Sequence, residues 1–597
     1  MRPWRNRLLL AGAVVALAAA LPALGQDTPE SLLPPGFSEP PAPKEEPRNA
    51  AEPAPPTAAP NEVAPAPTPG ADEATIEDGA AADLRDLPRF TPPYHVDVPE
   101  ALRRPVDIVG PLTPGNWGLG EGAFGTDRGA FHASLMRQLD APVASRWVSM
   151  LLRRALMSRV PAPRGVHPVD WVAERASLLV RMGEADAARS LVQAVDVGNY
   201  TPLMIQAALD TALASADPGG LCPIVAPGRA LVDRPVWRLA DAICSALAGD
   251  ATRASQLIGE ARNRGGIGGA DLALAEKLVG AGTDSRRSAT VRWQEVDGLT
   301  AWRFGLAGAT GMEIPAELVR GAGPRVQAWH ARAPMVPFEQ RVESAYVAAA
   351  LGVFSSNALV EMQSQIFERT DQAEVAETPA GRLRTAFVHR DPAQRVAALR
   401  QLWGEGEGGQ QRYGRLILTA TASAHLPVDS ARGGDADELI AAMLSAGLDR
   451  EAARWATLVA SGDADARAWG LLAVGGPQGA VDPIASIAAF QDLDDSRDHK
   501  RTEMLVAALI GLGRAGGDLA GEYGVDLSLE NRWTRALDDA ARSRRPGAVA
   551  LLAAVGLQAG DWAEVPAAHL FRIVRALRSV GYDYEARMIA AEAVMRL

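Results

Sequence analysis

The chain has 597 residues, of which 47% are apolar and 5% aromatic, and its formal net charge is −12. A composition rich in alanine and leucine and poor in aromatic and β-branched residues argues against a large β-sheet protein. The negative charge argues against a nucleic-acid-binding protein, which needs a basic surface. Two cysteines are too few for a disulfide-stapled miniprotein or an array of zinc fingers.

The first 25 residues have the layout of a secretory signal peptide. Three arginines fall within the first seven residues, an apolar run covers residues 8–21, and the small residues Ala23 and Gly25 precede the expected cut. The fourteen residues of this run fall short of the ~20 that a membrane-spanning helix needs. We therefore expect cleavage after Gly25 and export, to the periplasm if the host is Gram-negative. The alternative is an uncleaved membrane anchor, the one way in which the sequence indicates contact with a membrane.

Residues 26–86 are predicted to be a disordered acidic linker rich in proline and alanine. Residues 27–86 contain thirteen acidic and three basic residues, and fourteen prolines fall between Pro29 and Pro69. Such a segment buries too little apolar surface to offset its ordering entropy. Residues 1–26 carry +3 and residues 27–86 carry −10, which leaves −5 for residues 87–597. The folded part is thus close to neutral, and no attraction to a polyanion or an anionic membrane is predicted.

Residues 87–126 are rich in proline and glycine, and we expect an extended arm with a short strand near residues 106–109. In residues 127–597 apolar residues recur at helical spacing, and the intervals between the helical segments are too short for anything but antiparallel helix pairs. The predicted fold class is all-α, a solenoid of helical-hairpin repeats preceded by a disordered segment. The alternatives are an irregular helical array and two helical domains that meet near residues 404–434.

Four predicted turns between helices share a glycine that is followed five residues later by an alanine. The pairs are Gly183 with Ala188, Gly249 with Ala254, Gly447 with Ala452, and Gly581 with Ala586. Glycine takes the left-handed geometry that ends one helix, and alanine lets the next helix approach closely. The glycines are 66, 198 and 134 residues apart, which is roughly two, six and four units of 33 to 34 residues.

At these positions the sequence resembles the tetratricopeptide repeats, whose helix-turn-helix unit has a glycine and an alanine at this offset. The segment of residues 581–587 is the most similar to the family pattern. The resemblance implies an α-solenoid that binds a protein or peptide in its concave groove and does not catalyse a reaction. It assigns no further functional residue, because this family shares none.

Cys222 and Cys244 are expected to form a disulfide, since two cysteines 22 residues apart in an exported protein usually pair. Cys222 is expected in a loop and Cys244 in a helix over residues 235–247. The alternative is two buried free thiols.

The sequence contains no recognisable catalytic or cofactor motif. No two of its eight histidines lie within thirty positions, no lysine lies in a phosphate-binding loop, and no Gly-x-Ser-x-Gly turn occurs. Residues 492–498, with Glu503 at the twelfth position, have the ligand spacing of a calcium loop, but Arg497 occupies the place of the required glycine. The alternative is an acidic loop in which Asp498 caps the next helix. We therefore predict no metal and no cofactor.

These observations favour an exported, non-enzymatic helical-repeat scaffold or adaptor that binds another protein of the cell envelope. A second interpretation is a peptidoglycan-associated protein similar to the superhelical domain of soluble lytic transglycosylases, for which the dipeptide Glu343-Ser344 is the candidate catalytic pair within the predicted helical region. A third interpretation is a structural spacer of the envelope. The sequence indicates no oligomeric state.

Overall fold

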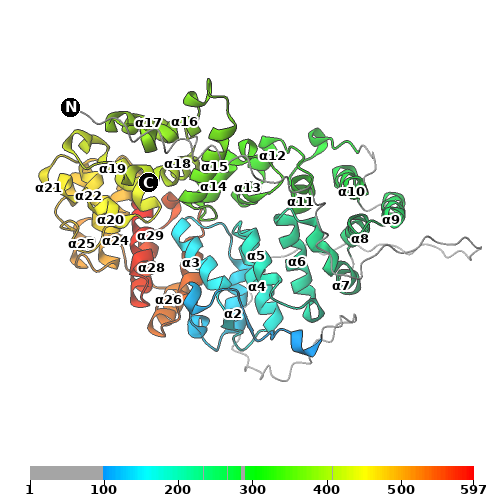
Figure 1. Cartoon of the computed structure of the whole chain (residues 1–597). Helices are drawn as coiled ribbons and strands as arrows, with labels where there is room; N and C mark the ends of the chain where they lie inside the picture. The colour runs from blue at the N-terminus through cyan, green and yellow to red at the C-terminus, as the bar shows by residue number, and fades with distance from the viewer. Residues whose placement is uncertain (1–98, 233, 265–266, 284–288, 407) are drawn as a thin grey trace, which may run out of the picture. The chain divides into compact units, whose positions relative to one another are not determined.

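Apolar residues at three- and four-residue spacing fold the chain into a succession of α-helices (Figure 1). The computed structural model describes residues 99–232, 234–264, 267–283, 289–406 and 408–597. The predicted signal peptide, the predicted linker and the first twelve residues of the predicted arm lie outside the described residues.

The helices and strands have the following bounds. The α-helices are α2 (Gly129–Gln138), α3 (Arg146–Met157), α4 (Pro168–Arg181), α5 (Ala185–Val192), α6 (Pro202–Ala214), α7 (Val225–Leu231), α8 (Val236–Leu247), α9 (Ala251–Arg264), α10 (Gly269–Gly282), α11 (Ala301–Ala309), α12 (Ala316–Gly321), α13 (Pro324–Arg332), α14 (Phe338–Ala350), α15 (Ser356–Arg369), α16 (Pro379–Val388), α17 (Pro392–Gly404), α18 (Gly409–Ala424), α19 (Ala436–Ser445), α20 (Asp449–Ala453), α21 (Ala456–Ser461), α22 (Ala466–Gly475), α23 (Ile487–Asp492), α24 (Lys500–Gly511), α25 (Asp518–Glu522), α26 (Arg532–Arg542), α27 (Pro546–Gly556), α28 (Ala567–Ser579) and α29 (Asp583–Met595). The strands are β1 (Ile108–Val109) and β2 (Val160–Pro161), and the 3₁₀ helices are η2 (Glu100–Leu102), η3 (Pro114–Asn116), η4 (Glu121–Phe124), η5 (Val197–Asn199), η6 (Pro218–Ile224), η7 (Trp293–Glu295), η8 (Val375–Glu377), η9 (Ser430–Asp435), η10 (Arg497–His499) and η11 (Trp562–Glu564).

The predicted all-α class is confirmed for the described part of the chain. Within it, the two strands form one short antiparallel ladder, in which Ile108 lies opposite Pro161 and Val109 opposite Val160. This ladder fastens the described part of the arm to the turn that follows α3. Phe124 of the arm is buried and packs edge to face on Trp171, with 5.3 Å between the ring centroids.

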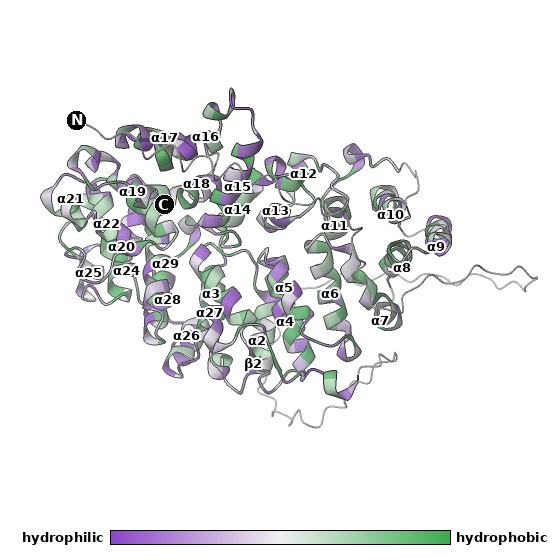
Figure 2. Ribbon diagram, in the orientation of Figure 1, coloured by the Kyte–Doolittle hydropathy of each residue, from purple (hydrophilic) through white to green (hydrophobic). Residues whose placement is uncertain are grey.

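Consecutive helices pack as antiparallel hairpins, among them α4 with α5, α8 with α9, α13 with α14, α18 with α19, and α28 with α29. Figure 2 shows hydrophobic and hydrophilic residues on different sides of many of these helices. The apolar sides meet in one continuous core, and burial of apolar surface is the main force that holds such an array together.

The four glycine-alanine turns share one backbone geometry. Their glycines have φ angles of 87°, 84°, 81° and 91° in chain order. In each turn the glycine N–H donates to the carbonyl three residues back, and the next N–H donates to the carbonyl five residues back. This is the Schellman arrangement, which satisfies the last carbonyls of the first helix. All four alanines are fully buried, where a larger side chain would hold the two helices apart.

The same hydrogen-bond pattern occurs at turns that the search for glycine-alanine pairs missed. Gly352 and Gly513 have positive φ angles of 90° and 64°, and the same two hydrogen bonds close their turns. Five residues later the chain has Asn357 and Asp518 instead of alanine. At a further such turn Arg544 takes φ 50° without the freedom of glycine.

The helical array also makes contacts between segments far apart in the sequence. Helices α27 and α29 both pack against α3, and Figure 1 shows the red α29 near the cyan α3. Helix α18 begins shortly after Gly404, where a boundary between two domains was an alternative. It packs against α14, which precedes Gly404 in the sequence, and against α19, which follows it. In a simple solenoid each repeat contacts only its neighbours, so the packing of α29 on α3 adds a long-range closure to the array.

Within the described residues, no helix combines the length and the apolar character that a bilayer crossing requires.

Candidate functional site

A cavity of about 540 Å³ lies among α18, α19, α22 and the end of α29. Its lining is mixed. The apolar lining includes Leu416, Ala441, Leu471, Phe490 and Val594, and the charged lining consists of Arg412, Arg467, Arg501, Arg596, Asp437, Glu438, Asp495 and Asp561.

Helical periodicity places these side chains on the cavity side of their helices. On α18, Arg412 and Leu416 are four residues apart, and on α22 the same spacing separates Arg467 from Leu471. Residues four apart lie on one face of a helix. Each of these helices therefore presents one arginine and one leucine to the cavity.

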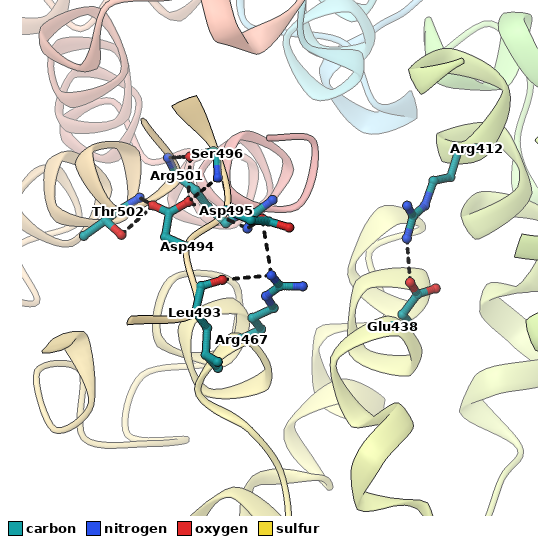
Figure 3. Close-up of polar contacts among 9 residues, drawn as sticks. All are labelled: Arg412, Glu438, Arg467, Leu493, Asp494, Asp495, Ser496, Arg501 and Thr502. Atoms are coloured by element: carbon teal, nitrogen blue, oxygen red, sulfur yellow. Dashed lines mark hydrogen bonds and ion pairs between the residues drawn. The ribbon is translucent and has the colours of Figure 1, made fainter. Parts of the chain in front are cut away.

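The arginines that line the cavity are held by acceptors of the protein. Arg412 donates to Glu438 Oε1 at 2.5 Å, and Arg501 donates to Asp495 Oδ1 at 2.7 Å (Figure 3). Arg467 donates to the carbonyl of Leu493 at 2.8 Å and lies 3.2 Å from Asp495. These contacts fix the guanidinium groups and leave little of their charge uncompensated.

The fourth arginine, Arg596, belongs to a buried cluster that forms the wall of the cavity. It donates to the carbonyl of Ala144 at 2.6 Å and to Glu592 Oε1 at 2.8 Å, and its guanidinium lies 4.8 Å from the centre of the Tyr413 ring. Burial, with the nearby Glu592 carboxylate, raises the pKa of Tyr413 above its ordinary value.

Glu592 is fully buried and caps the amino terminus of α3 from 447 positions away. Its carboxylate accepts the Ser145 hydroxyl at 2.6 Å and the backbone N–H of Arg146 at 2.9 Å. A carboxylate at a helix amino terminus satisfies free N–H groups and the positive end of the helix dipole. The Arg146 guanidinium in turn donates to the carbonyls of Ala349 and Phe354. These hydrogen bonds link α3, α14 and α29 at the wall of the cavity.

Asp437 and Glu438 lie in the first turn of α19. Unlike the lining arginines, which all have acceptors, these two carboxylates are not fully paired with donors. Burial, and next the Asp465 carboxylate, raise the pKa of Asp437 to about 6. A hydrogen bond from the backbone N–H of Glu438 opposes this increase, and so does the charge of Arg467, which has the smallest effect. Glu438 uses Oε1 for Arg412, while its Oε2 is buried without a hydrogen-bond partner. The cavity therefore contains two neighbouring carboxyl groups whose charge is incompletely balanced.

The predicted repeat turns do not line this cavity, but two of them make long-range contacts. Gly447 accepts a hydrogen bond from the Tyr584 hydroxyl at 2.7 Å, next to the turn at Gly581. At Gly183 the backbone lies so close to Ala328 that an added Cβ would be 2.6 Å from the alanine Cβ. By the same measure, Gly249 and Gly581 face open space.

Cys222 and Cys244 form a disulfide, with 5.4 Å between their Cα atoms. Cys244 lies in α8, as expected, but Cys222 lies in the 3₁₀ helix η6 and not in a loop. Proline residues at positions 218 and 223 suit a 3₁₀ turn because they lack the N–H that a longer α-helix uses. The bridge thus joins η6 to α8, outside the cavity.

The acidic loop before α24 is organised by Asp494, so the expectation that Asp498 caps this helix was wrong. Asp494 Oδ2 accepts the N–H and hydroxyl of Thr502 at 2.8 and 2.7 Å, and its Oδ1 accepts the N–H and hydroxyl of Ser496 (Figure 3). Asp498 has a left-handed backbone, φ 55°, and not the extended conformation that a capping residue usually adopts. Glu503, the expected twelfth ligand of a calcium loop, accepts from Lys500 at 2.7 Å.

Among the described residues, no group of three or more histidine, cysteine, aspartate or glutamate side chains is placed to hold a metal ion.

The dipeptide Glu343-Ser344 lies on α14. Ser344 is buried and its hydroxyl lies 2.9 Å from His330 Nδ1. Burial, and next the charge of Arg341, lower the pKa of His330 to about 4. A neutral histidine beside a serine is the arrangement that activates a nucleophile, but both side chains are enclosed by the core. Glu343 is mostly exposed and lies 3.8 Å from Arg415.

Sequence reasoning missed the cavity, because its lining comes from helices and loops spread over nearly two hundred positions. The one local signal is the pair Asp437-Glu438 at the start of α19, but acidic residues in a first turn are also an ordinary way to stabilise a helix amino terminus.

The chain was compared with family models, curated proteins and solved structures, and none of them matches it.

Proposed function

We propose that the protein is an exported, non-enzymatic helical-repeat scaffold, and that the cavity among α18, α19, α22 and α29 binds a peptide segment of another cell-envelope protein. The observation that carries the proposal is this cavity, whose lining combines apolar side chains with charged ones, most of them held by hydrogen bonds within the protein. Ligand sites of proteins combine apolar area with a few oriented polar groups in this way.

The size of the cavity favours a peptide segment over a folded partner. Its volume of about 540 Å³ is in the range of ligand pockets, roughly 300–1,000 Å³, and accommodates a few side chains. The hydrogen bonds of Glu592 hold one wall of the cavity together, and such preorganisation reduces the ordering cost of binding. The resemblance of the four turns to tetratricopeptide repeats supports the same class of ligand.

The export part of the proposal is supported by the basic and apolar pattern of residues 1–25. Export would place the protein in the periplasm of a Gram-negative host, where another envelope protein is the expected partner. The length of the predicted proline-rich linker suits a scaffold that reaches such a partner.

The proposal is tested by selecting peptides from a displayed library of random twelve-residue sequences against the purified full chain. The selected peptides are then measured against Gln410→Trp, in which a half-buried residue at the edge of the cavity becomes bulky. The matched control is Gln401→Trp, at an exposed position on α17 outside the cavity.

We expect the selected peptides to bind the wild type and Gln401→Trp alike and to bind Gln410→Trp at least tenfold more weakly, a loss of about 1.4 kcal/mol. Thermal unfolding of both variants checks that the fold is intact. Equal binding to all three proteins, or no enrichment of any peptide, would contradict the proposal.

A further inference from the structure

We propose that the bound segment inserts a lysine or arginine into the cavity, its cationic head against Asp437 and Glu438 and its aliphatic stem against Leu471. This inference rests on the proposed function and names the chemistry of the partner: a basic residue flanked by apolar residues.

The charge inventory of the cavity supports a cationic ligand group. The four lining arginines all donate to carboxylates or carbonyls of the protein. Of the lining acids, Asp495 is bound by Arg501, and Asp561 accepts the N–H of Ala563 at 2.7 Å. Glu438 has one oxygen engaged and one without a partner, and Asp437 forms no ion pair with a cationic side chain among the described residues. The unsatisfied capacity of the cavity is therefore negative.

The surroundings of Asp437 make a cation favourable there. Glu438 on the same helix and Asp465 at the start of α22 repel its charge, and Arg467 of α22 is engaged with Asp495 and the Leu493 carbonyl. The raised pKa of Asp437 reports that this carboxylate is poorly stabilised in the free protein. An ammonium or guanidinium group would offset both repulsions and supply donors to Glu438 Oε2.

The apolar lining explains why a side chain suits the site better than a bare cation. Ala441 lies one turn after Asp437 on α19, and Leu471 lies one turn after Arg467 on α22. Lysine and arginine bury their methylene stems along such surfaces while the charged end contacts polar groups. A metal ion or an inorganic cation would leave this lining without a partner.

The experiment uses one peptide from the selection described above, or a pool of them, and the full chain. Each basic residue is replaced in turn by norleucine, which keeps the stem of lysine and removes its charge. The protein variants are Asp437→Asn, which keeps the shape of the side chain, and Glu522→Gln as control, an exposed acid on α25 outside the cavity.

We expect one norleucine replacement to weaken binding to the wild type at least tenfold, and Asp437→Asn to weaken the parent peptide by a similar factor. The two changes together should weaken binding little more than either alone, because they remove the same contact. Because the pKa of Asp437 is about 6 in the free protein, the carboxylate is protonated at pH 5 and charged at pH 8. Binding to the wild type should therefore weaken about tenfold from pH 8 to pH 5, and binding to Asp437→Asn should not.

The outcomes separate this inference from the proposed function. Peptides that bind at the cavity but carry no essential basic residue, or bind Asp437→Asn unchanged, overturn the inference and leave the proposed function standing. Peptides that bind Gln410→Trp as tightly as the wild type overturn both the inference and the proposed function. A threefold or smaller effect in Glu522→Gln is required for the loss in Asp437→Asn to be assigned to the cavity.

Discussion

Replacing the turn glycines by alanine separates backbone strain from steric contact. Gly249 and Gly581 have left-handed φ angles but open space around an added Cβ, whereas Gly183 and Gly447 have the same φ and a close neighbour. At Gly183 the new Cβ would lie 2.6 Å from the Cβ of Ala328, and at Gly447 it would lie 2.1 Å from the Tyr584 hydroxyl oxygen. The four sites thus form two matched pairs.

The expected magnitudes follow from these two terms. A left-handed backbone destabilises the folded alanine variant by roughly 1–2 kcal/mol. The alanine also lowers the conformational entropy of the unfolded chain, which stabilises the fold by about 0.4–1 kcal/mol. Gly249→Ala and Gly581→Ala should therefore lower the free energy of unfolding by about 1 kcal/mol. Overpacking adds roughly 1–3 kcal/mol, so Gly183→Ala and Gly447→Ala should lower it by about 2–4 kcal/mol.

The assay is urea unfolding followed by far-ultraviolet circular dichroism, with the shift of the midpoint compared among variants at constant slope. Arg544→Gly is the reverse test: this exposed arginine takes φ 50° at an equivalent turn, so glycine should leave stability unchanged or raise it. If all four glycine variants lose the same stability, the contacts to Ala328 and Tyr584 are not tight and the reasoning fails. A stabilising Gly249→Ala would refute the left-handed geometry itself.

Three further predictions concern other parts of the fold. Alkylation of the unreduced protein should label neither Cys222 nor Cys244, and replacing both by alanine should lower the free energy of unfolding by about 3 kcal/mol; mass spectrometry showing two labelled thiols contradicts the first statement. Glu592→Ala should lower the free energy of unfolding by about 3–5 kcal/mol, because it leaves the buried Arg596 without its carboxylate and the start of α3 uncapped. The exposed control Glu522→Ala should change it by less than about 0.5 kcal/mol. Equal effects of the two variants in a urea titration would contradict the role assigned to Glu592. Asp437→Asn should have the same free energy of unfolding as the wild type at pH 4 and a higher one, by up to about 3 kcal/mol, at pH 8. The reason is that the pKa of Asp437 is about 6 in the folded state and 3.8 ordinarily, so the wild type gains stability as the pH falls from 6 to 4. A wild type that is more stable than the variant at pH 8 contradicts this sign.

The helices were predictable because their signals are local. Residues 127–597 were expected to be helical, and α2 to α29 lie within this range, since apolar periodicity and the breaks at glycine and proline act over a few positions. The identical Schellman hydrogen bonds at the four glycines have the same origin.

The contacts that build the cavity depend on packing between distant segments and left no such signal. Nothing near Glu592 indicates that it caps a helix 447 positions earlier, and the pattern around Tyr413 looks like any amphipathic helix. Asp498 was expected to cap α24, but Asp494 accepts the N–H of Thr502 in its place. The left-handed backbone at Asp498 is a feature that residue spacing alone does not reveal.

Hydrogen exchange of the full chain with and without a selected peptide tests the central claim most directly, because it locates the binding site without any substitution. We predict slower exchange in the first turns of α18 and α19, in α22 and at the end of α29, with no change around the Cys222–Cys244 bridge. Protection confined to helices that do not line the cavity would contradict the assignment of this cavity as the peptide site.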